Sequence, residues 1–286
     1  MSILLRANLR IDHADTGDGP PVLLLHSSVS GNRQWRKLMA QLSGRFRVIA
    51  PNLRGYGGTT PWHGERAQTL PDAAQVVMEQ CDALQLDAPL RIVGHSYGGA
   101  VALWSAHKLG ERVSHLALYE PMLPGLLPAH GRLEAAKDTA ALYADVKRLS
   151  AAGDWMALAQ RFTDYFNGDG AWDASPPERR QMIAELLPPN PHEWDACIKP
   201  LLADTLHGIR AQGLLLRGGA TRPALAAMAA LLHQHFAHWR LVDVPGCGHM
   251  APLTHADEIN RWIDEFLGSG DALPAVGGNE KAATCA

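Results

Sequence analysis

Residues 92–100 read Ile-Val-Gly-His-Ser-Tyr-Gly-Gly-Ala, which sets one serine between two glycines. An apolar run precedes this G-x-S-x-G pattern and an alanine-rich run follows it, so the sequence predicts a strand, a sharp turn and a helix. Glycines two residues to either side let the backbone turn closely around Ser96. A helix that begins directly after the serine directs N–H groups and partial positive charge toward it. The pattern predicts an exposed nucleophile at Ser96; the competing interpretation is an ordinary glycine-rich turn.

Around this stretch, short apolar runs alternate with longer helical stretches. This order is typical of a mostly parallel sheet with helices on both faces, so the predicted fold class is α/β. Strands are expected at residues 2–11, 22–26, 47–50, 90–93, 114–119, 213–217 and 240–244. Helices are expected at residues 35–42, 70–84, 98–108, 222–235 and 255–267.

One segment interrupts the alternation, because it carries no strand signal. Its helical pieces are expected at residues 133–151, 154–166, 177–186 and 194–203. We therefore predict a core of residues 1–120 and 209–268, a helical cap of residues 121–208, and a flexible C-terminal tail of residues 269–286. Four cap aromatics are candidates for an apolar substrate pocket: Trp155, Phe162, Phe166 and Trp172. The competing interpretation is that they form the core of the cap itself.

The overall composition is that of a globular protein. The 286 residues include 47% hydrophobic ones, enough for one large α/β domain. A net charge of −3 provides no electrostatic reason to expect nucleic acid or an anionic membrane as partner. The four cysteines form no CxxC pair, which argues against a zinc site or a redox motif, so no metal or cofactor is expected. No signal peptide and no membrane span are recognised, so a cytoplasmic location is expected.

A serine needs a base to take its proton, and His249 is the candidate. It lies in residues 245–252, Pro-Gly-Cys-Gly-His-Met-Ala-Pro, directly after the last predicted strand. Such loops gather at the carboxyl edge of an α/β sheet. His26 and His95 come nearest among the other histidines. A residue next to the serine points away from it, however, and His26 is interpreted as a structural hydrogen-bonding residue.

The loop after the strand at 22–26 offers backbone donors at the same edge. Its residues 26–31 read His-Ser-Ser-Val-Ser-Gly. The N–H groups of Ser28 and Tyr97 are the candidate donors of an oxyanion hole.

Together these motifs resemble the α/β-hydrolase superfamily, from residue 20 to about residue 268. The matching parts are the H-x-x-x-x-G loop at 26–31, the Pro-Asn-Leu-Arg-Gly-Tyr-Gly turn at 51–57, the elbow at 94–98 and the G-x-G-H-M-A-P run at 246–252. Two positions depart from the pattern: Ser27 stands where glycine is common, and Asn52 stands where aspartate is common. Neither change removes a catalytic atom.

The resemblance implies a triad acid, which in most members follows the penultimate strand. Here that position holds Thr221, which cannot carry the charge. Some members, certain haloalkane dehalogenases among them, place the acid after the strand that in this chain ends before Glu120. Glu120 is therefore the candidate acid, since it keeps the superfamily's order of nucleophile, acid and base. Asp243, within a predicted strand, and a dyad without an acid are the alternatives.

The implied function is a carboxylesterase-like serine hydrolase that cleaves an ester or a related small acyl substrate through an acyl-enzyme. A serine at the elbow argues against dehalogenase or epoxide-hydrolase chemistry, which in this superfamily starts from an aspartate. The alternatives are the same triad acting on a C–C bond, a lactone or an amide, and a non-catalytic receptor for a small ligand.

Overall fold

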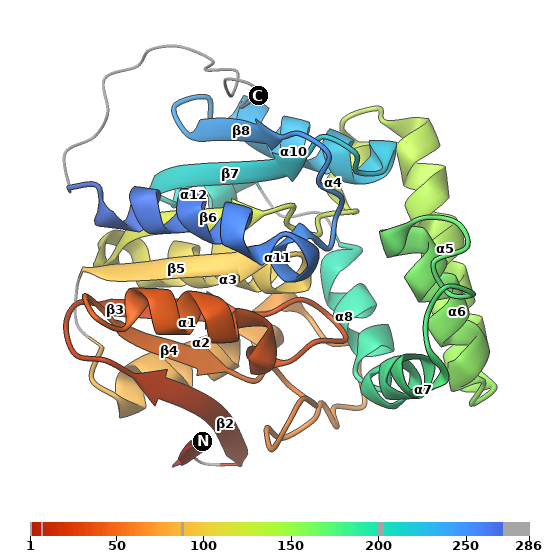
Figure 1. Ribbon diagram of the computed structural model, residues 1–286, viewed down its shortest axis with the longest axis horizontal. Helices are drawn as coiled ribbons and strands as arrows, with labels where there is room; N and C mark the ends of the chain where they lie inside the picture. The colour runs from red at the N-terminus through yellow and green to blue at the C-terminus, as the bar shows by residue number, and fades with distance from the viewer. Residues whose placement is uncertain (1, 7, 87–88, 200–202, 271–286) are drawn as a thin grey trace.

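The fold is described from a computed structural model, which covers residues 2–6, 8–86, 89–199 and 203–270. Its centre is an eight-stranded sheet of order β1-β2-β4-β3-β5-β6-β7-β8 (Figure 1). The strands are β1 Ser2–Arg6, β2 Leu9–Thr16, β3 Pro21–Leu25, β4 Arg47–Pro51, β5 Leu90–His95, β6 Val113–Tyr119, β7 Gln212–Gly218 and β8 Arg240–Val244. β1 pairs antiparallel with β2, and β2 pairs antiparallel with β4. The other strands in the sheet order, β4-β3-β5-β6-β7-β8, are parallel to one another. The predicted α/β class with a mostly parallel sheet is confirmed.

The single strand expected at residues 2–11 is wrong. The chain forms two strands there, and they pair antiparallel from Ser2 opposite His13 to Arg6 opposite Leu9. Apolar and polar residues keep alternating on both sides of the reversal, so the period-2 pattern does not mark where the chain turns back.

Helices cover both faces of the sheet (Figure 1). α1 Arg36–Leu42 and α12 Ala256–Gly268 pack on one face, and α2 Leu70–Ala83, α3 Tyr97–Leu109 and α10 Pro223–His235 pack on the other. Short helical turns complete the core: η1 Asn32–Trp35, η2 Gly110–Arg112 and α11 Ala251–Thr254. β3 shows why both faces are covered. Its Val22 and Leu24 belong to the core on the α1 side, whereas Leu23 and Leu25 belong to the core on the α3 side.

The described chain between β6 and β7 contains helices and no strand, and we call residues 121–208 the helical insertion. Its helices are α4 Leu126–Ala129, α5 Leu133–Ala151, α6 Trp155–Asn167, α7 Pro177–Leu186, α8 Asn190–Cys197 and α9 Ala203–His207. In Figure 1, α5 to α8 lie beyond the carboxyl ends of the parallel strands. This is the edge at which an α/β sheet gathers its functional loops.

One expected helix in this part of the chain is corrected, and part of its range lies outside the described residues. The short helices α4 and α9 were not predicted. The helix expected at 194–203 instead begins at Asn190 as α8 and ends at Cys197, while residues 200–202 lie outside the described residues. Pro191 occupies the first turn of α8, where its missing N–H interrupts no hydrogen bond. Most of the predicted tail, residues 271–286, also lies outside the described residues.

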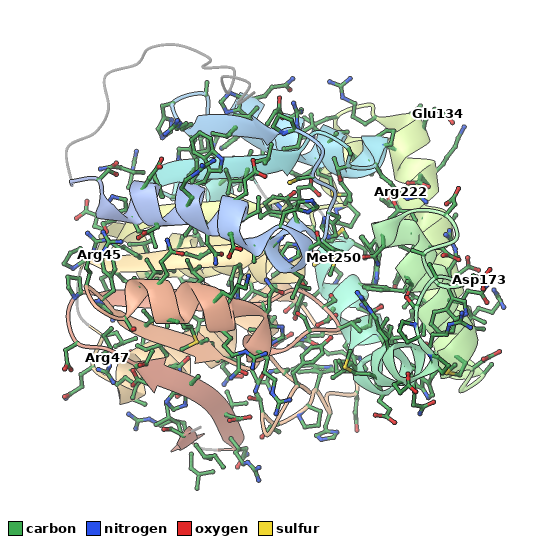
Figure 2. All side chains as sticks on the ribbon, viewed as in Figure 1. Arg45, Arg47, Glu134, Asp173, Arg222 and Met250 are labelled. Carbon is green, nitrogen blue, oxygen red and sulfur yellow. The ribbon has the colours of Figure 1, made fainter. Side chains whose placement is uncertain are left out.

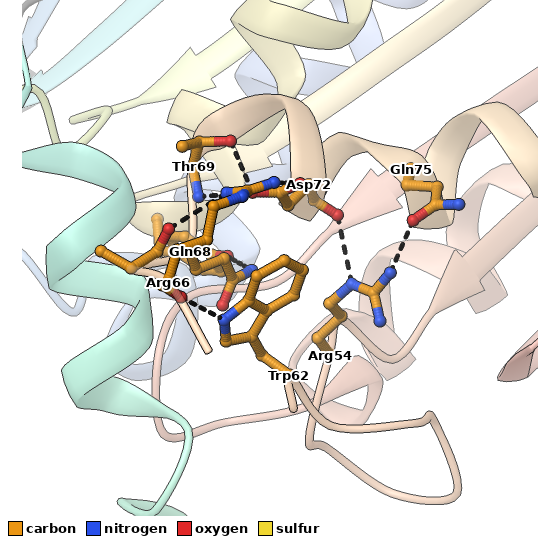
Figure 3. Close-up of polar contacts among 9 residues, drawn as sticks. Arg54, Trp62, Arg66, Gln68, Thr69, Asp72 and Gln75 are labelled. Carbon is orange, nitrogen blue, oxygen red and sulfur yellow. Dashed lines mark hydrogen bonds and ion pairs between the residues drawn. The ribbon is translucent and has the colours of Figure 1, made fainter. Parts of the chain in front are cut away.

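The segment that leads into α2 is fixed to that helix by polar contacts (Figure 3). Asp72 in the first turn accepts the backbone N–H of Thr69 at 2.9 Å, and it accepts two guanidinium N–H groups of Arg66 at 2.7 Å each. A side chain that returns to the N-cap in this way stabilises the start of a helix. Gln68, beside this cap, donates to the hydroxyl of Tyr97 at 3.4 Å. The segment is thereby tied to the residue that follows Ser96.

Candidate active site

Ser96 lies between β5 and α3 in a conformation that few side chains adopt, with φ 54° and ψ −119°. The neighbouring glycines are required by close backbone packing. A Cβ on Gly98 would lie 2.3 Å from the carbonyl oxygen of Leu25, and one on Gly94 would lie 2.7 Å from the carbonyl oxygen of Gly98. Neither glycine has a positive φ. The strain of the turn is therefore carried by Ser96 itself, and the glycines allow α3 to pack against the end of β3.

Three predicted side chains meet in one hydrogen-bonded line. Ser96 Oγ lies 2.9 Å from His249 Nε2, and His249 Nδ1 lies 2.7 Å from Glu120 Oε2. All three residues are buried. A carboxylate only accepts hydrogen bonds, so the contact with Glu120 places the imidazole proton on Nδ1. Nε2 then has a free lone pair directed at the serine hydroxyl, the arrangement that makes a serine oxygen nucleophilic.

Glu120 occupies the first position after β6 and is anchored to the end of β7. Its Oε1 accepts the backbone N–H of Gly218 at 2.8 Å, and its Oε2 accepts the hydroxyl of Thr221 at 2.9 Å. Thr221, at the position where the resemblance implies an acid, thus donates a hydrogen bond to the predicted acid Glu120. The alternative acid Asp243 is engaged elsewhere, because it lies in β8 and forms an ion pair with Arg217 at 2.7 Å.

The loop that carries His249 is held in place by hydrogen bonds from two side chains of the sheet. His95 Nε2 donates to the carbonyl oxygen of His249 at 2.9 Å, and the hydroxyl of Tyr119 donates to that of Gly248 at 2.7 Å. Burial, with His249 close by, keeps the pKa of His95 well below its usual value, so this support stays neutral. His26 is also structural: its Nε2 accepts a backbone N–H, and burial lowers its pKa to about 4.

The predicted oxyanion donors lie beside the nucleophile, since Ser28, Tyr97 and Ser96 line one small pocket. The N–H of Ser27 donates to a glutamine side chain, and that of Val29 donates to a tyrosine hydroxyl. Among the described residues, the N–H of Ser28 has no acceptor. It is therefore available to an oxygen bound next to Ser96, as the helix-terminal N–H of Tyr97 is.

The two departures from the superfamily pattern are accommodated by hydrogen bonds. The hydroxyl of Ser27 donates to Gln34 at 2.9 Å. Asn52 accepts the N–H of Asn32 at 2.8 Å and donates through Nδ2 to Asp12 at 2.9 Å. An aspartate at position 52 would face the carboxylate of Asp12, so an amide suits this place better.

Two pockets flank the hydrogen-bonded line. One has a volume of about 450 Å³ and is lined by His249 together with Arg222 and Met250, both labelled in Figure 2. The other, of about 10 Å³, is lined by Ser96 and the predicted oxyanion donors. Phe166 lines both pockets, and its ring lies 4.8 Å from the imidazole of His249. Phe166 therefore divides the space on the serine side from the space on the histidine side.

The four predicted cap aromatics take different places. Phe162 and Phe166 line the small pocket next to Ser96. Trp155 and Trp172 line neither pocket and pack into the hydrophobic core instead. For these two tryptophans the pocket prediction is corrected, because they pack with the hydrophobic core, as the competing interpretation expects of residues that line no pocket.

Sequence reasoning missed several residues of the small pocket, notably Glu193, Trp194, Met122 and Cys197. Glu193 is buried on α8, and this burial raises its pKa to about 7. Pro191, a typical first-turn residue, was the signal that could have moved the predicted start of this helix upstream and placed Glu193 on it.

Within the described residues, no cluster of three or more histidine, cysteine, aspartate or glutamate side chains is arranged to hold a metal ion. In the same part of the chain, none of the helices combines the length and apolar character that crossing a bilayer requires.

Comparisons with known proteins agree with this architecture. The chain is 27% identical to 2-hydroxy-6-oxo-2,4-heptadienoate hydrolase of Pseudomonas putida strain F1, covering 94% of this chain and 96% of that protein. It is 27% identical to pimeloyl-[acyl-carrier protein] methyl ester esterase of Nitrosospira multiformis, over 87% of this chain and 95% of the relative. The crystal structure of the enol-lactonase from Burkholderia xenovorans LB400 superposes with a TM-score of 0.74 at 19% identity, covering 94% of this chain and all of that one. The model of the alpha/beta hydrolase family matches residues 22–262, and this chain belongs to that family.

Proposed function

We propose that this chain is a serine hydrolase that cleaves a carboxylic ester or a related small acyl substrate through an acyl-enzyme. The observation that carries the proposal is the continuous line from Ser96 Oγ through His249 to Glu120, with contacts of 2.9 and 2.7 Å. Membership of a hydrolase family supports hydrolysis as the reaction class. The methyl ester esterase among the relatives supports an ester as the bond that is cleaved.

In the proposed mechanism, Ser96 Oγ attacks the carbonyl carbon while His249 Nε2 takes the hydroxyl proton. Glu120 keeps the Nδ1 proton in place and stabilises the imidazolium that forms. The backbone N–H groups of Ser28 and Tyr97 bind the oxygen that becomes negative in the tetrahedral intermediate. His249 then gives its proton to the leaving alcohol, and the acyl group stays on Ser96.

The second half repeats these steps with water. His249 takes a proton from a water molecule, the hydroxide adds to the acyl carbon, and a second tetrahedral intermediate forms. Its collapse returns the proton to Ser96 Oγ and releases the carboxylic acid. The proposed steps use side chains and backbone groups of this chain and one water molecule.

We also propose that the helical insertion is a cap over this site, because two of its aromatics close the space around Ser96. Phe162 and Phe166 line the small pocket, and the insertion lies beyond the carboxyl ends of the strands. The Trp155 and Trp172 side chains contribute to the packing of the cap itself.

Hydrolysis of a C–C bond next to a carbonyl is a second candidate function. The compound in the name of the Pseudomonas putida relative, 2-hydroxy-6-oxo-2,4-heptadienoate, contains no ester or amide bond. Hydrolysing such a compound therefore requires that a C–C bond breaks. The same serine, base and oxyanion donors would act on it, so geometry alone does not separate the two reactions.

Labelling with a fluorophosphonate tests the enzyme itself. Stoichiometric labelling of the wild-type chain, located at Ser96 by peptide mass spectrometry, is the expected result. Ser96→Ala is the matched control and should stay unlabelled. A folded wild-type protein that does not react would refute the proposal and favour a non-catalytic receptor.

A substrate panel then separates the reactions. We would compare p-nitrophenyl esters of increasing acyl length with lactones and with a vinylogous 1,5-diketone, each with Ser96→Ala as background. Higher kcat/KM on the esters supports the first candidate. Preference for the diketone by more than tenfold would replace it with the second.

A further inference from the structure

Glu193 is a buried carboxyl group in the wall of the small pocket next to Ser96. It lies on α8 and is 3% exposed. Asn190 Nδ2 donates to its Oε2 at 3.1 Å. No hydrogen bond of normal geometry reaches its buried Oε1 among the described residues, although the side chains of Ser28 and Tyr56 are near enough to stabilise its charge. A buried polar oxygen of this kind lowers stability unless a ligand supplies the missing donor.

The side chains that affect the ionisation of Glu193 are uncharged. A hydrogen-bond donor on a ligand would therefore not have to displace a salt bridge. Burial has the larger effect and disfavours the ionised form of Glu193, whereas the polar side chains of Ser28, Asn190 and Tyr56 favour that form. The walls of the same pocket are otherwise largely apolar and include Phe162 and Trp194. A single buried acceptor in an apolar pocket is the usual way in which a site selects one polar group of a ligand.

The position of the pocket assigns it to the acyl half of a substrate. The leaving group receives its proton from His249, so it must lie on the histidine side of Ser96, where the pocket of about 450 Å³ is found. The oxyanion donors and Glu193 line the other pocket, which faces the carbonyl and acyl side of the substrate that remains after the leaving group departs.

From these observations we propose that Glu193 is a specificity-determining residue, which accepts a hydrogen bond from a hydroxyl or ammonium group on a short acyl chain. The inference rests on the proposed function and deepens it. The pocket beside Ser96 has a volume of about 10 Å³, which is room for about one water molecule, so it can receive one polar group of the acyl chain and not the whole chain. The donor therefore belongs near the scissile carbonyl, at the second or third carbon of the acyl chain.

The test compares p-nitrophenyl butyrate with the 3-hydroxybutyrate and 3-aminobutyrate esters by kcat/KM. One of the two polar esters is expected to be preferred over butyrate by about tenfold to a hundredfold, the range for leaving one buried acceptor unpaired. Glu193→Leu should abolish that preference. Glu193→Gln should keep a preference for the hydroxyl ester and lose one for the ammonium ester, which identifies the donor. Glu185→Gln, an exposed glutamate of α7, is the matched control and should behave as wild type.

A second measurement tests ligand binding in the absence of catalysis. Binding of 3-hydroxybutyramide, 3-aminobutyramide and butyramide to Ser96→Ala, measured by calorimetry or NMR titration, should show the same preference and lose it in the Ser96→Ala/Glu193→Leu double variant. Equal affinities for the three amides would overturn the role of Glu193. So would a kcat/KM on the butyrate ester that equals or exceeds that on both polar esters, in a wild-type enzyme that a fluorophosphonate labels. Either result would leave the proposed hydrolase function intact. A chain that is not labelled overturns the proposed function instead. Circular dichroism verifies that each variant is folded. If Glu193→Leu does not fold, the Glu193→Gln variant and the binding of the three amides to Ser96→Ala alone decide the question.

Discussion

Replacing Glu120 with glutamine is expected to slow acylation of Ser96 by about 10³- to 10⁴-fold, the loss associated with the acid of a triad. The contacts of the carboxylate explain why the amide is a poor substitute. Gly218 N–H donates to Oε1, while Thr221 and His249 both donate to Oε2. A glutamine has one oxygen and one NH₂ group, so it cannot accept on both sides.

Each orientation of the glutamine has a consequence. With its NH₂ toward Gly218, two donors face each other. With its oxygen toward Gly218, its NH₂ faces His249 Nδ1 and favours the tautomer with the proton on Nε2. That tautomer cannot take the proton of Ser96. The expected rate loss corresponds to about 4 to 5.5 kcal/mol of transition-state stabilisation.

The assay is the second-order rate of fluorophosphonate labelling, which needs no knowledge of the natural substrate. Thr221→Asp in the Glu120→Gln background tests the geometry further. The Thr221 hydroxyl lies 2.9 Å from the oxygen that holds His249, so a carboxylate at 221 should restore at least about tenfold of the lost rate. Glu265→Gln, an exposed glutamate on α12, is the control. A loss below tenfold in folded Glu120→Gln would show that the acid lies elsewhere.

Three further predictions concern stability and the support of the site. Gly98→Ala would place a methyl group 2.3 Å from the carbonyl oxygen of Leu25, so urea unfolding should show a loss of about 1–3 kcal/mol or more. Tyr119→Phe removes the 2.7 Å hydrogen bond to Gly248, so it should lower the unfolding free energy by about 1 kcal/mol and slow labelling of Ser96. Burial raises the pKa of Glu193 from 4.5 to about 7, so between these values the folded chain binds more protons than the unfolded chain. Stability should then fall as pH rises through this window, by about 3 kcal/mol in total, and urea unfolding at pH 5 and pH 8 should show that Glu193→Gln removes this part of the pH dependence.

Each of these predictions has an outcome that contradicts it. An unchanged unfolding midpoint in Gly98→Ala would mean that the end of β3 moves away at little cost. Unaltered labelling in Tyr119→Phe would show that other contacts suffice to hold the histidine loop. The same pH dependence in Glu193→Gln and in wild type would assign it to other groups, and Glu178→Gln, an exposed glutamate, is the control for that comparison.

The sequence predicts those parts of the fold and of the site that depend on short local patterns. Ser96 and His249 stand in glycine-bounded turns at strand ends, so their neighbours in the chain suffice to place them. Glu120 lies at the end of a neighbouring parallel strand, at the same edge of the sheet, but its choice as the acid rests on the resemblance to family members that place the acid there. What local patterns do not contain is the docking of one element on another. The direction in which the aromatics of α6 point depends on how the insertion packs, which is why Phe162 and Trp155 have different surroundings.

Glu193 is a second case in which local sequence patterns do not show how the elements pack. A glutamate is expected at the surface, and nothing in its immediate neighbours contradicts that. Its burial arises from the packing of α8 over the loop that carries Ser28, two segments far apart in the chain. The hairpin of β1 and β2 was missed for a related reason, since pairing between strands is a tertiary property that alternation alone does not define.

In the proposed mechanism, the anchoring of Glu120 separates the chemistry from the selectivity. The carboxylate is fixed to Gly218 and Thr221, both of which lie outside the helical insertion. Any hinge about which the insertion moves must then lie after this residue, from Pro121 onward. Residues 121–208 can therefore diverge, in evolution or by exchange with the corresponding segment of a relative, and supply new substrate walls while the proton relay stays as it is.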